Sequence, residues 1–188
     1  MPTHVALLRG INVGVQTRVA MSDLREIVTS LGHQDVATYI QSGNVVFTSP
    51  AADPARLADD LAAAISARLG ISPAVVVLSR EDLAGAIAAN PYPQAASPKL
   101  LHAVFRREEM NDEQVAAVAA AERRARDKGS PDEATVIGRT LYLHTPGGLG
   151  RSELAAQLSR TGQAMSPGGG GTARNWATVT RLMAMLED

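Results

Sequence analysis

The segment "DVATYIQSGNVVFTS" (35–49) is predicted to form a β-hairpin, because two runs of strand-forming residues surround a short turn that contains glycine. Both runs are rich in the β-branched and aromatic side chains that favour strands. A helix is predicted on each side of this hairpin, and a short apolar strand beyond each helix. The predicted elements are strand 4–9, helix 22–32, strands 35–40 and 44–49, helix 53–70 and strand 74–79. This order, βαββαβ, is the ferredoxin-like pattern.

Residues that favour helix ends mark the boundaries of both helices. Ser22 is the expected N-cap of the first helix, and Gly32 closes it. For the second helix, Asp53 suits the N-cap, Pro54 suits the first helical position and Gly70 ends the helix.

The second half of the chain repeats much of this order. Ser79 and Asp82 have capping-box spacing and predict a short linker helix, which the prolines of "NPYP" end. Asn111 and Gln114 form a second capping pair, at the start of a longer helix. The further predicted elements are strand 100–106, helix 111–127, strands 133–138 and 140–145, and helix 151–160.

Near the end of the chain, an arginine lies at the start of a predicted helix, where a positive charge is unfavourable. A helix is predicted over 172–186 with Thr172 as its N-cap, and a short strand around "QAMS" (163–166) is a candidate to close the second sheet. Arg174 then lies in the first turn, where the positive end of the helix dipole disfavours a cation. We therefore interpret Arg174 either as a clamp for an anion or as a staple between the two halves.

These elements predict an α+β protein of two ferredoxin-like (βαββαβ-type) halves, with antiparallel sheets and a C-terminal helix. Residues 1–79 form the first predicted half. Residues 80–188 form the second, with the linker helix and the C-terminal helix.

Composition narrows the classes of function. The chain has 188 residues, 45% hydrophobic and 20% charged, which is typical of a globular protein with a packed core. The net charge of -1 and the aromatic content of 3% argue against nucleic-acid binding, because RNA-binding sheets stack bases on aromatic side chains. The absence of cysteine, of a signal peptide and of a long apolar run predicts a cytoplasmic protein without a membrane partner.

The loop "LLRGINVG" is the first candidate site. Arg9 ends a strand, and Gly10 and Gly14 bracket Asn12 in the loop that follows. Backbone N–H groups and a guanidinium there can converge on a phosphate or carboxylate, and Arg18 lies a few residues on. No Gly-Lys-Ser/Thr follows, so this is not a nucleotide-binding P-loop. The alternative is a tight turn with no ligand.

The segment "TARNWATV" is the second candidate site. Arg174 and Asn175 at the expected helix start form an anion-binding corner, and Trp176 either stacks on a ligand or fills the core. In the hairpin turn "QSGN", Ser42 and Asn44 offer a hydroxyl and an amide, although a plain turn uses the same residues.

The sequence leaves any catalytic residue unknown, and it predicts no cofactor or metal. Nucleophile-elbow, zinc-protease and paired-carboxylate signatures are absent from it. Of the four histidines, His102 and His144 lie on strands that are predicted to be neighbours. A pair does not make a zinc site, because zinc takes at least three protein ligands.

Four stretches together carry a family resemblance: "VALLRGINVG" (5–14), "YIQSGNVVF" (39–47), "YLHTPGGLGRSEL" (142–154) and "TARNWATV" (172–179). In this order they resemble the bacterial family "domain of unknown function 1697". Val15, where relatives often have a second glycine, and the "SPGGGG" run depart from the pattern. The resemblance implies a two-part α+β fold on ferredoxin-like halves. It implies no activity, and no catalytic residue is carried over from it.

Three classes of function remain open from the sequence. The first is binding of a small anionic ligand, such as a nucleotide or a phosphorylated metabolite, through the arginine and glycine-loop sites. The second is a protein–protein interaction or oligomerisation scaffold, including a homodimer. The third is an enzyme with an unrecognised active site.

Overall fold

The computed structural model describes residues 1–12, 18–51, 53–161 and 171–188. Backbone contacts group Met1–Gly85 with Thr180–Asp188 as a first compact unit, and Ala86–Val179 as a second. The elements are β1 (His4–Arg9), α1 (Met21–Ser30), β2 (Gln34–Tyr39), β3 (Asn44–Thr48), α2 (Pro54–Leu69), β4 (Ala74–Ser79), α3 (Arg80–Ala88), β5 (Leu101–Phe105), α4 (Asp112–Asp127), β6 (Glu133–Ile137), β7 (Thr140–His144), η1 (Leu149–Arg151), α5 (Glu153–Thr161), β8 (Thr172–Asn175) and α6 (Trp176–Glu187).

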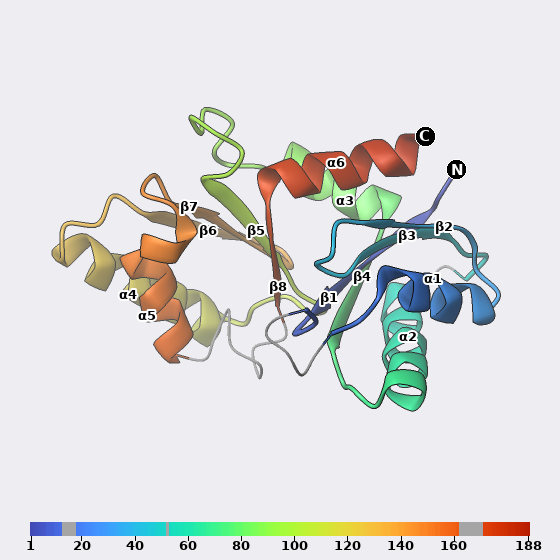
Figure 1. Ribbon diagram of the computed structural model, residues 1–188. Helices are drawn as coiled ribbons and strands as arrows, with labels where there is room; N and C mark the ends of the chain where they lie inside the picture. Colours follow the sequence, from blue (N-terminus) through green and yellow to red (C-terminus); the bar gives the residue numbers. More distant parts are fainter. Residues whose placement is uncertain (13–17, 52, 162–170) are drawn as a thin grey trace. The chain divides into compact units, whose positions relative to one another are not determined.

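The first unit contains an antiparallel sheet in the order β2-β3-β1-β4. Helices α1 and α2 lie along one face of this sheet (Figure 1). Apolar side chains from both helices and from alternate strand positions make one buried cluster between them, because side chains alternate across a strand. Leu24, Leu61 and Phe47 are among its fully buried members.

The outer edge of this sheet, β2, is irregular. Its pairing with β3 shifts register between Gln34 and Ala37, and Asp35 between them has a left-handed φ of 51°. A bulge of this kind twists an edge strand and interrupts the row of groups that another strand would pair with.

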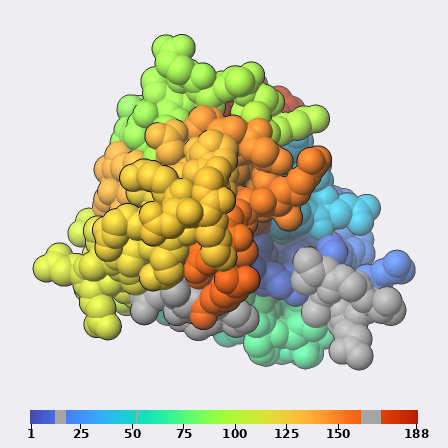
Figure 2. Space-filling model, turned by 90° about the vertical axis from the view of Figure 1, so that its left-hand side faces the viewer, coloured from blue at the N-terminus to red at the C-terminus, as the bar shows by residue number. Residues whose placement is uncertain are grey.

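The second unit repeats the topology, with an antiparallel sheet in the order β6-β7-β5-β8. Helices α4 and α5 pack side by side, and the space-filling view shows them together on one face of this unit (Figure 2). Val104, Leu141 and Leu143 of the sheet and Leu154 and Leu158 of α5 are buried in one cluster. The two sheets confirm the predicted α+β fold of ferredoxin-like halves.

Most of the helix signals act as predicted. The Asp53 side chain accepts a hydrogen bond from the N–H of Ala55, and Gly70 ends α2 in the left-handed conformation. Asn111 and Gln114 form a reciprocal capping box at α4. Ser79 and Asp82 exchange the corresponding two bonds at α3.

The predicted N-cap of the first helix is wrong by two residues. Helix α1 begins at Met21, its N-cap is Ala20, and the Ser22 hydroxyl does not cap it. An alanine side chain cannot accept a hydrogen bond, so no N-cap side chain satisfies the first N–H groups of α1.

The predicted helix over 172–186 is also wrong at its start. Thr172–Asn175 is strand β8, which pairs antiparallel with β5, and helix α6 begins only at Trp176. Arg174 therefore lies on a strand and not in a helical turn. The ladder with β5 satisfies backbone groups over several residues, which outweighs one capping bond. The predicted strand at 163–166 lies outside the described residues.

Within the ranges that the structure describes, no helix is both long enough and apolar enough to cross a membrane.

Candidate functional site

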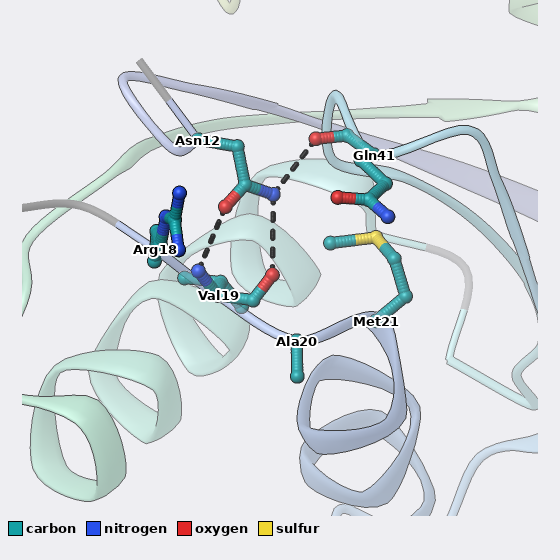
Figure 3. Close-up of a pocket in the computed structure, with 6 residues that line it drawn as sticks. All are labelled: Asn12, Arg18, Val19, Ala20, Met21 and Gln41. Atoms are coloured by element: carbon teal, nitrogen blue, oxygen red, sulfur yellow. Dashed lines mark hydrogen bonds between the residues drawn. The ribbon is translucent and has the colours of Figure 1, made fainter. Parts of the chain in front are cut away.

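The Asn12 side chain closes the loop between β1 and α1. Its Oδ1 accepts a hydrogen bond from the N–H of Val19 at 2.8 Å, and its Nδ2 donates to the Val19 carbonyl at 3.1 Å. The same Nδ2 donates to the carbonyl of Gln41 at 2.7 Å (Figure 3). Asn12 has a left-handed φ of 55°, a conformation that asparagine tolerates better than most residues. The amide thus joins β1, the residues before α1 and the β2–β3 turn.

A pocket of about 680 Å³ lies beside this amide, which we call the Asn12 pocket. In Figure 3 the Arg18 guanidinium and the Gln41 side chain lie on opposite sides of Asn12. Arg18 is exposed, and no hydrogen bond or ion pair joins it to another residue in the described part of the chain. The described residues that line the Asn12 pocket are Asn12, Arg18, Val19, Ala20, Met21 and Gln41.

The pocket borders the start of α1. Ala20 and Met21, the N-cap and first residue of the helix, both line it. Free N–H groups and the positive end of the helix dipole favour anions at such a position. Asp23, in the same helical turn, already supplies one negative charge. Because the Asp23 carboxylate is already negative, a further anion at this helix end depends on the positive charge of Arg18.

The remaining predicted residues of the first unit shape the backbone around the pocket. Arg9 is half-buried at the end of β1, and Gly10 has a φ of 82°. Asn44 is fully buried, and its Nδ2 donates to the Tyr39 carbonyl and to the Ser42 hydroxyl, both at 3.1 Å. Gly14 lies outside the described residues.

Sequence reasoning missed Gln41 and Met21 as lining residues. The available signal was topological: because β1 pairs antiparallel with β3, the turn before β3 returns to the end of β1. Leu7 lies opposite Asn44, and the N–H of Leu8 donates to the Gly43 carbonyl at 2.8 Å.

Three predicted residues belong to the second unit. Arg174 pairs with Ala103 on β5, and its Nη1 donates to the Ala173 carbonyl at 2.9 Å. Asn175 accepts a hydrogen bond from the N–H of Thr178 at 2.8 Å, so it caps α6. The half-buried Trp176 ring lies 6.3 Å from the Tyr142 ring, centroid to centroid.

Within the described ranges, no three histidine, aspartate or glutamate side chains gather to hold a metal ion. Burial lowers the pKa of His102 on β5, and the buried Nδ1 of this residue has no hydrogen-bond partner.

Two buried histidines pack against Phe47 in the first unit. The ring centroids of His4 and His33 lie 5.8 and 4.8 Å from that of Phe47. Burial lowers the pKa of both, and the charge of His33 lowers the pKa of His4 further. Asp82 raises the pKa of His4 and Asp60 that of His33, against the larger effect of burial.

We expect stability to fall as the pH drops below the ordinary histidine pKa of 6.5. Below pH 6.5 the unfolded chain binds more protons than the folded chain. The free energy of unfolding therefore decreases as the pH falls from 6.5 towards the lowered pKa values of the folded protein. Each histidine contributes at most about 1.4 kcal/mol per pH unit. Urea unfolding at several pH values in this range measures how steeply the free energy of unfolding depends on pH. His102 also contributes to this dependence. His33→Gln should make the free energy of unfolding less dependent on pH. An unchanged pH dependence would show that His33 does not contribute to it.

Together, these observations define the class of the molecule: an α+β protein of two ferredoxin-like units. Residues 1–142 match the family described as "Protein of unknown function (DUF1697)", and the chain belongs to this family. Among solved structures, the chain is similar to the conserved bacterial protein SP0830 from Streptococcus pneumoniae, with a TM-score of 0.73 and 24% sequence identity over 98% of each chain. At that identity the likeness concerns the fold alone. No curated protein matches the chain.

Proposed function

We propose that the chain binds a small ligand with a phosphate or carboxylate group in the Asn12 pocket. One observation carries the proposal: the exposed Arg18 lines a pocket whose wall includes the uncapped start of α1. A guanidinium and free helix N–H groups together supply charge and hydrogen-bond donors for an oxyanion. The Asn12 amide is occupied by backbone partners, so its part is to fix the pocket's shape.

The pocket fits binding better than catalysis. Its described lining offers one permanent cation, two amides and apolar side chains, and none of these residues is a general acid or base near neutral pH. A ligand with one anionic group and an apolar or planar body would use both kinds of wall.

A scaffold that adds strands at the β2 edge has weaker support. The bulge at Asp35 interrupts that edge, and proteins use such irregularities to prevent strand addition.

The test is calorimetric titration with inorganic phosphate, nucleotides, sugar phosphates and simple carboxylates at low and moderate salt. We expect Arg18→Gln to raise the Kd of the best ligand about 10–100-fold, because a hydrogen bond to a charged group is worth about 1.5–3 kcal/mol. A thermal-shift assay gives a second readout: a ligand at about 100 times its Kd should raise Tm by roughly 5–11 °C in a chain of this size.

Arg56→Gln is the matched control. Arg56 is an exposed arginine of the same unit, on α2, and its Nε lies 3.9 Å from Asp60 Oδ2 in the next helical turn. This variant should bind as the wild type does. Equal Kd values for Arg18→Gln and Arg56→Gln would show that the Asn12 pocket is not the site.

A further inference from the structure

The Gln41 side chain is an unused hydrogen-bonding group at the Asn12 pocket. The backbone carbonyl of Gln41 accepts from Asn12, but no residue that the structure describes makes a hydrogen bond to its side-chain amide. Gln41 is exposed and lines the pocket, so a ligand there can reach the amide. A primary amide offers a donor and an acceptor side by side, which is the pattern that pairs with the edge of a nucleobase.

The backbone that carries Gln41 is held in an unfavourable conformation. Ile40, the residue before it, has a left-handed φ of 48°, which is rare for a β-branched residue. Its side chain is 52% exposed, so burial does little to offset this strain. Asn44 Nδ2 donates to the Tyr39 carbonyl, and Asn12 Nδ2 donates to the Gln41 carbonyl, so the peptides around Ile40 are fixed. Strain of this kind clusters at ligand-binding segments, and here it sets the direction in which Gln41 leaves the turn.

Met21 gives the same side of the pocket an apolar surface. Its side chain packs against the core of the first unit, and Met21 also lines the pocket. In Figure 3, Met21 and Gln41 lie on one side of Asn12 and Arg18 lies on the other. A thioether makes favourable contacts with aromatic rings. The side of the pocket away from Arg18 therefore suits both the polar edge and the flat face of a heterocyclic ring.

We propose that the ligand of the Asn12 pocket is a nucleotide. Its base lies against Met21 and pairs with the Gln41 amide, and its phosphate lies at Arg18 and the start of α1. The pocket volume of about 680 Å³ is within the range of roughly 300–1,000 Å³ that small-molecule sites span. This inference rests on the proposed function, because it leaves the anionic group at Arg18 and adds a base to it.

The experiment compares adenosine monophosphate (AMP) with ribose 5-phosphate, which has the same sugar and phosphate but a hydroxyl in place of the base. Calorimetric titration of the full chain at low salt gives both Kd values. We expect AMP to bind at least tenfold more tightly. Gln41→Leu keeps a side chain of similar size without the amide. It should raise the Kd of AMP about 3–10-fold and leave that of ribose 5-phosphate unchanged.

Gln34→Leu is the matched control. Gln34 is an exposed glutamine of the same unit, on β2, and it is not among the described residues that line the Asn12 pocket. This variant should bind both compounds as the wild type does. Equal effects of Gln41→Leu and Gln34→Leu on the Kd of AMP would overturn the role of Gln41.

The nucleotide inference and the proposed function fail in different ways. If Arg18→Gln weakens the binding of ribose 5-phosphate but AMP binds no better than ribose 5-phosphate, the pocket takes an anion and the assignment of a base is wrong. If Arg18→Gln changes the Kd of neither compound, the proposed site itself is wrong. If neither compound binds, the nucleotide inference fails, and the titrations with inorganic phosphate and carboxylates test the proposed function separately.

The methyl signal of Met21 gives a second readout that does not depend on the change in Kd. The six methionines are labelled with ¹³C at the methyl group, and Met21→Leu identifies the Met21 signal in the NMR spectrum. A base that lies against Met21 shifts this signal through its ring current. We expect AMP to shift it and ribose 5-phosphate to leave it in place. Equal shifts with both compounds would show that the base does not contact Met21.

Discussion

Replacing Asp132 by alanine should lower the free energy of unfolding by about 3–4 kcal/mol, because two hydroxyl donors lose a charged acceptor. Asp132 is 5% exposed and directly precedes β6. Its Oδ2 accepts hydrogen bonds from the Ser130 hydroxyl at 2.7 Å and the Ser152 hydroxyl at 2.8 Å. Ser152 in turn caps α5 by accepting from the N–H of Ala155 at 2.9 Å. The carboxylate therefore fastens the start of β6 to the start of α5.

Urea unfolding monitored by circular dichroism measures the loss. Asp127→Ala is the control, because Asp127 is an exposed residue in the last turn of α4, where a negative charge is unfavourable. It should change stability by less than about 0.5 kcal/mol. Asp132→Asn should fall between the two, since it keeps a neutral acceptor. If Asp132→Ala and Asp127→Ala unfold at the same urea concentration, the network does not stabilise the fold.

Gly43→Ala should also be costly, by about 3–4 kcal/mol, for two additive reasons. Gly43 has a φ of 74°, in the left-handed region that an alanine side chain disfavours. A Cβ there would meet Ile11 Cδ1 at 2.7 Å and Leu8 Cβ at 2.8 Å, so buried groups would have to move. The clash lies under the turn that carries Gln41, so the substitution should also disturb the Asn12 pocket.

Gly70→Ala separates the two reasons. Gly70 has a similar φ of 67°, but a Cβ there meets nothing within 4 Å. This control should cost only the backbone term, about 1–2 kcal/mol. Thermal and urea unfolding of the two variants give the difference. A Gly43→Ala protein no less stable than Gly70→Ala would mean that the close approach of Leu8 and Ile11 relaxes without cost.

The parts of the fold that could be predicted from sequence are those set by neighbouring residues. Asp53, Pro54 and Gly70 mark α2, and Asn111 with Gln114 marks α4, because each signal acts within a few positions of the chain. The order of these elements was sufficient to indicate the ferredoxin-like halves.

The start of α6 could not be predicted in this way. The local sequence predicts Thr172 as a helix N-cap, but its segment completes a sheet by pairing with β5, nearly seventy positions earlier in the chain. Asn175 performs the capping instead. Pairing with a strand that is distant in the sequence therefore overrides the local preference for a helix start. The residues next to Thr172 carry no information about that pairing.

The candidate site shows the same division. The glycine-containing loop sequence points to Asn12 and Arg18, and both line one pocket. The loop sequence does not point to Gln41, because this residue reaches the pocket only through the pairing of β1 with β3. The loop sequence also gave no sign that the Asn12 amide would be used by the backbone of Val19.

The division of the chain into units has a consequence for the order of events during synthesis. The first unit includes Thr180–Asp188, which a ribosome adds only after all of Ala86–Val179. Domains fold broadly in the order in which they emerge, from the N-terminus onward. Here the unit that begins to emerge first acquires its final segment last, after every residue of the second unit has been made.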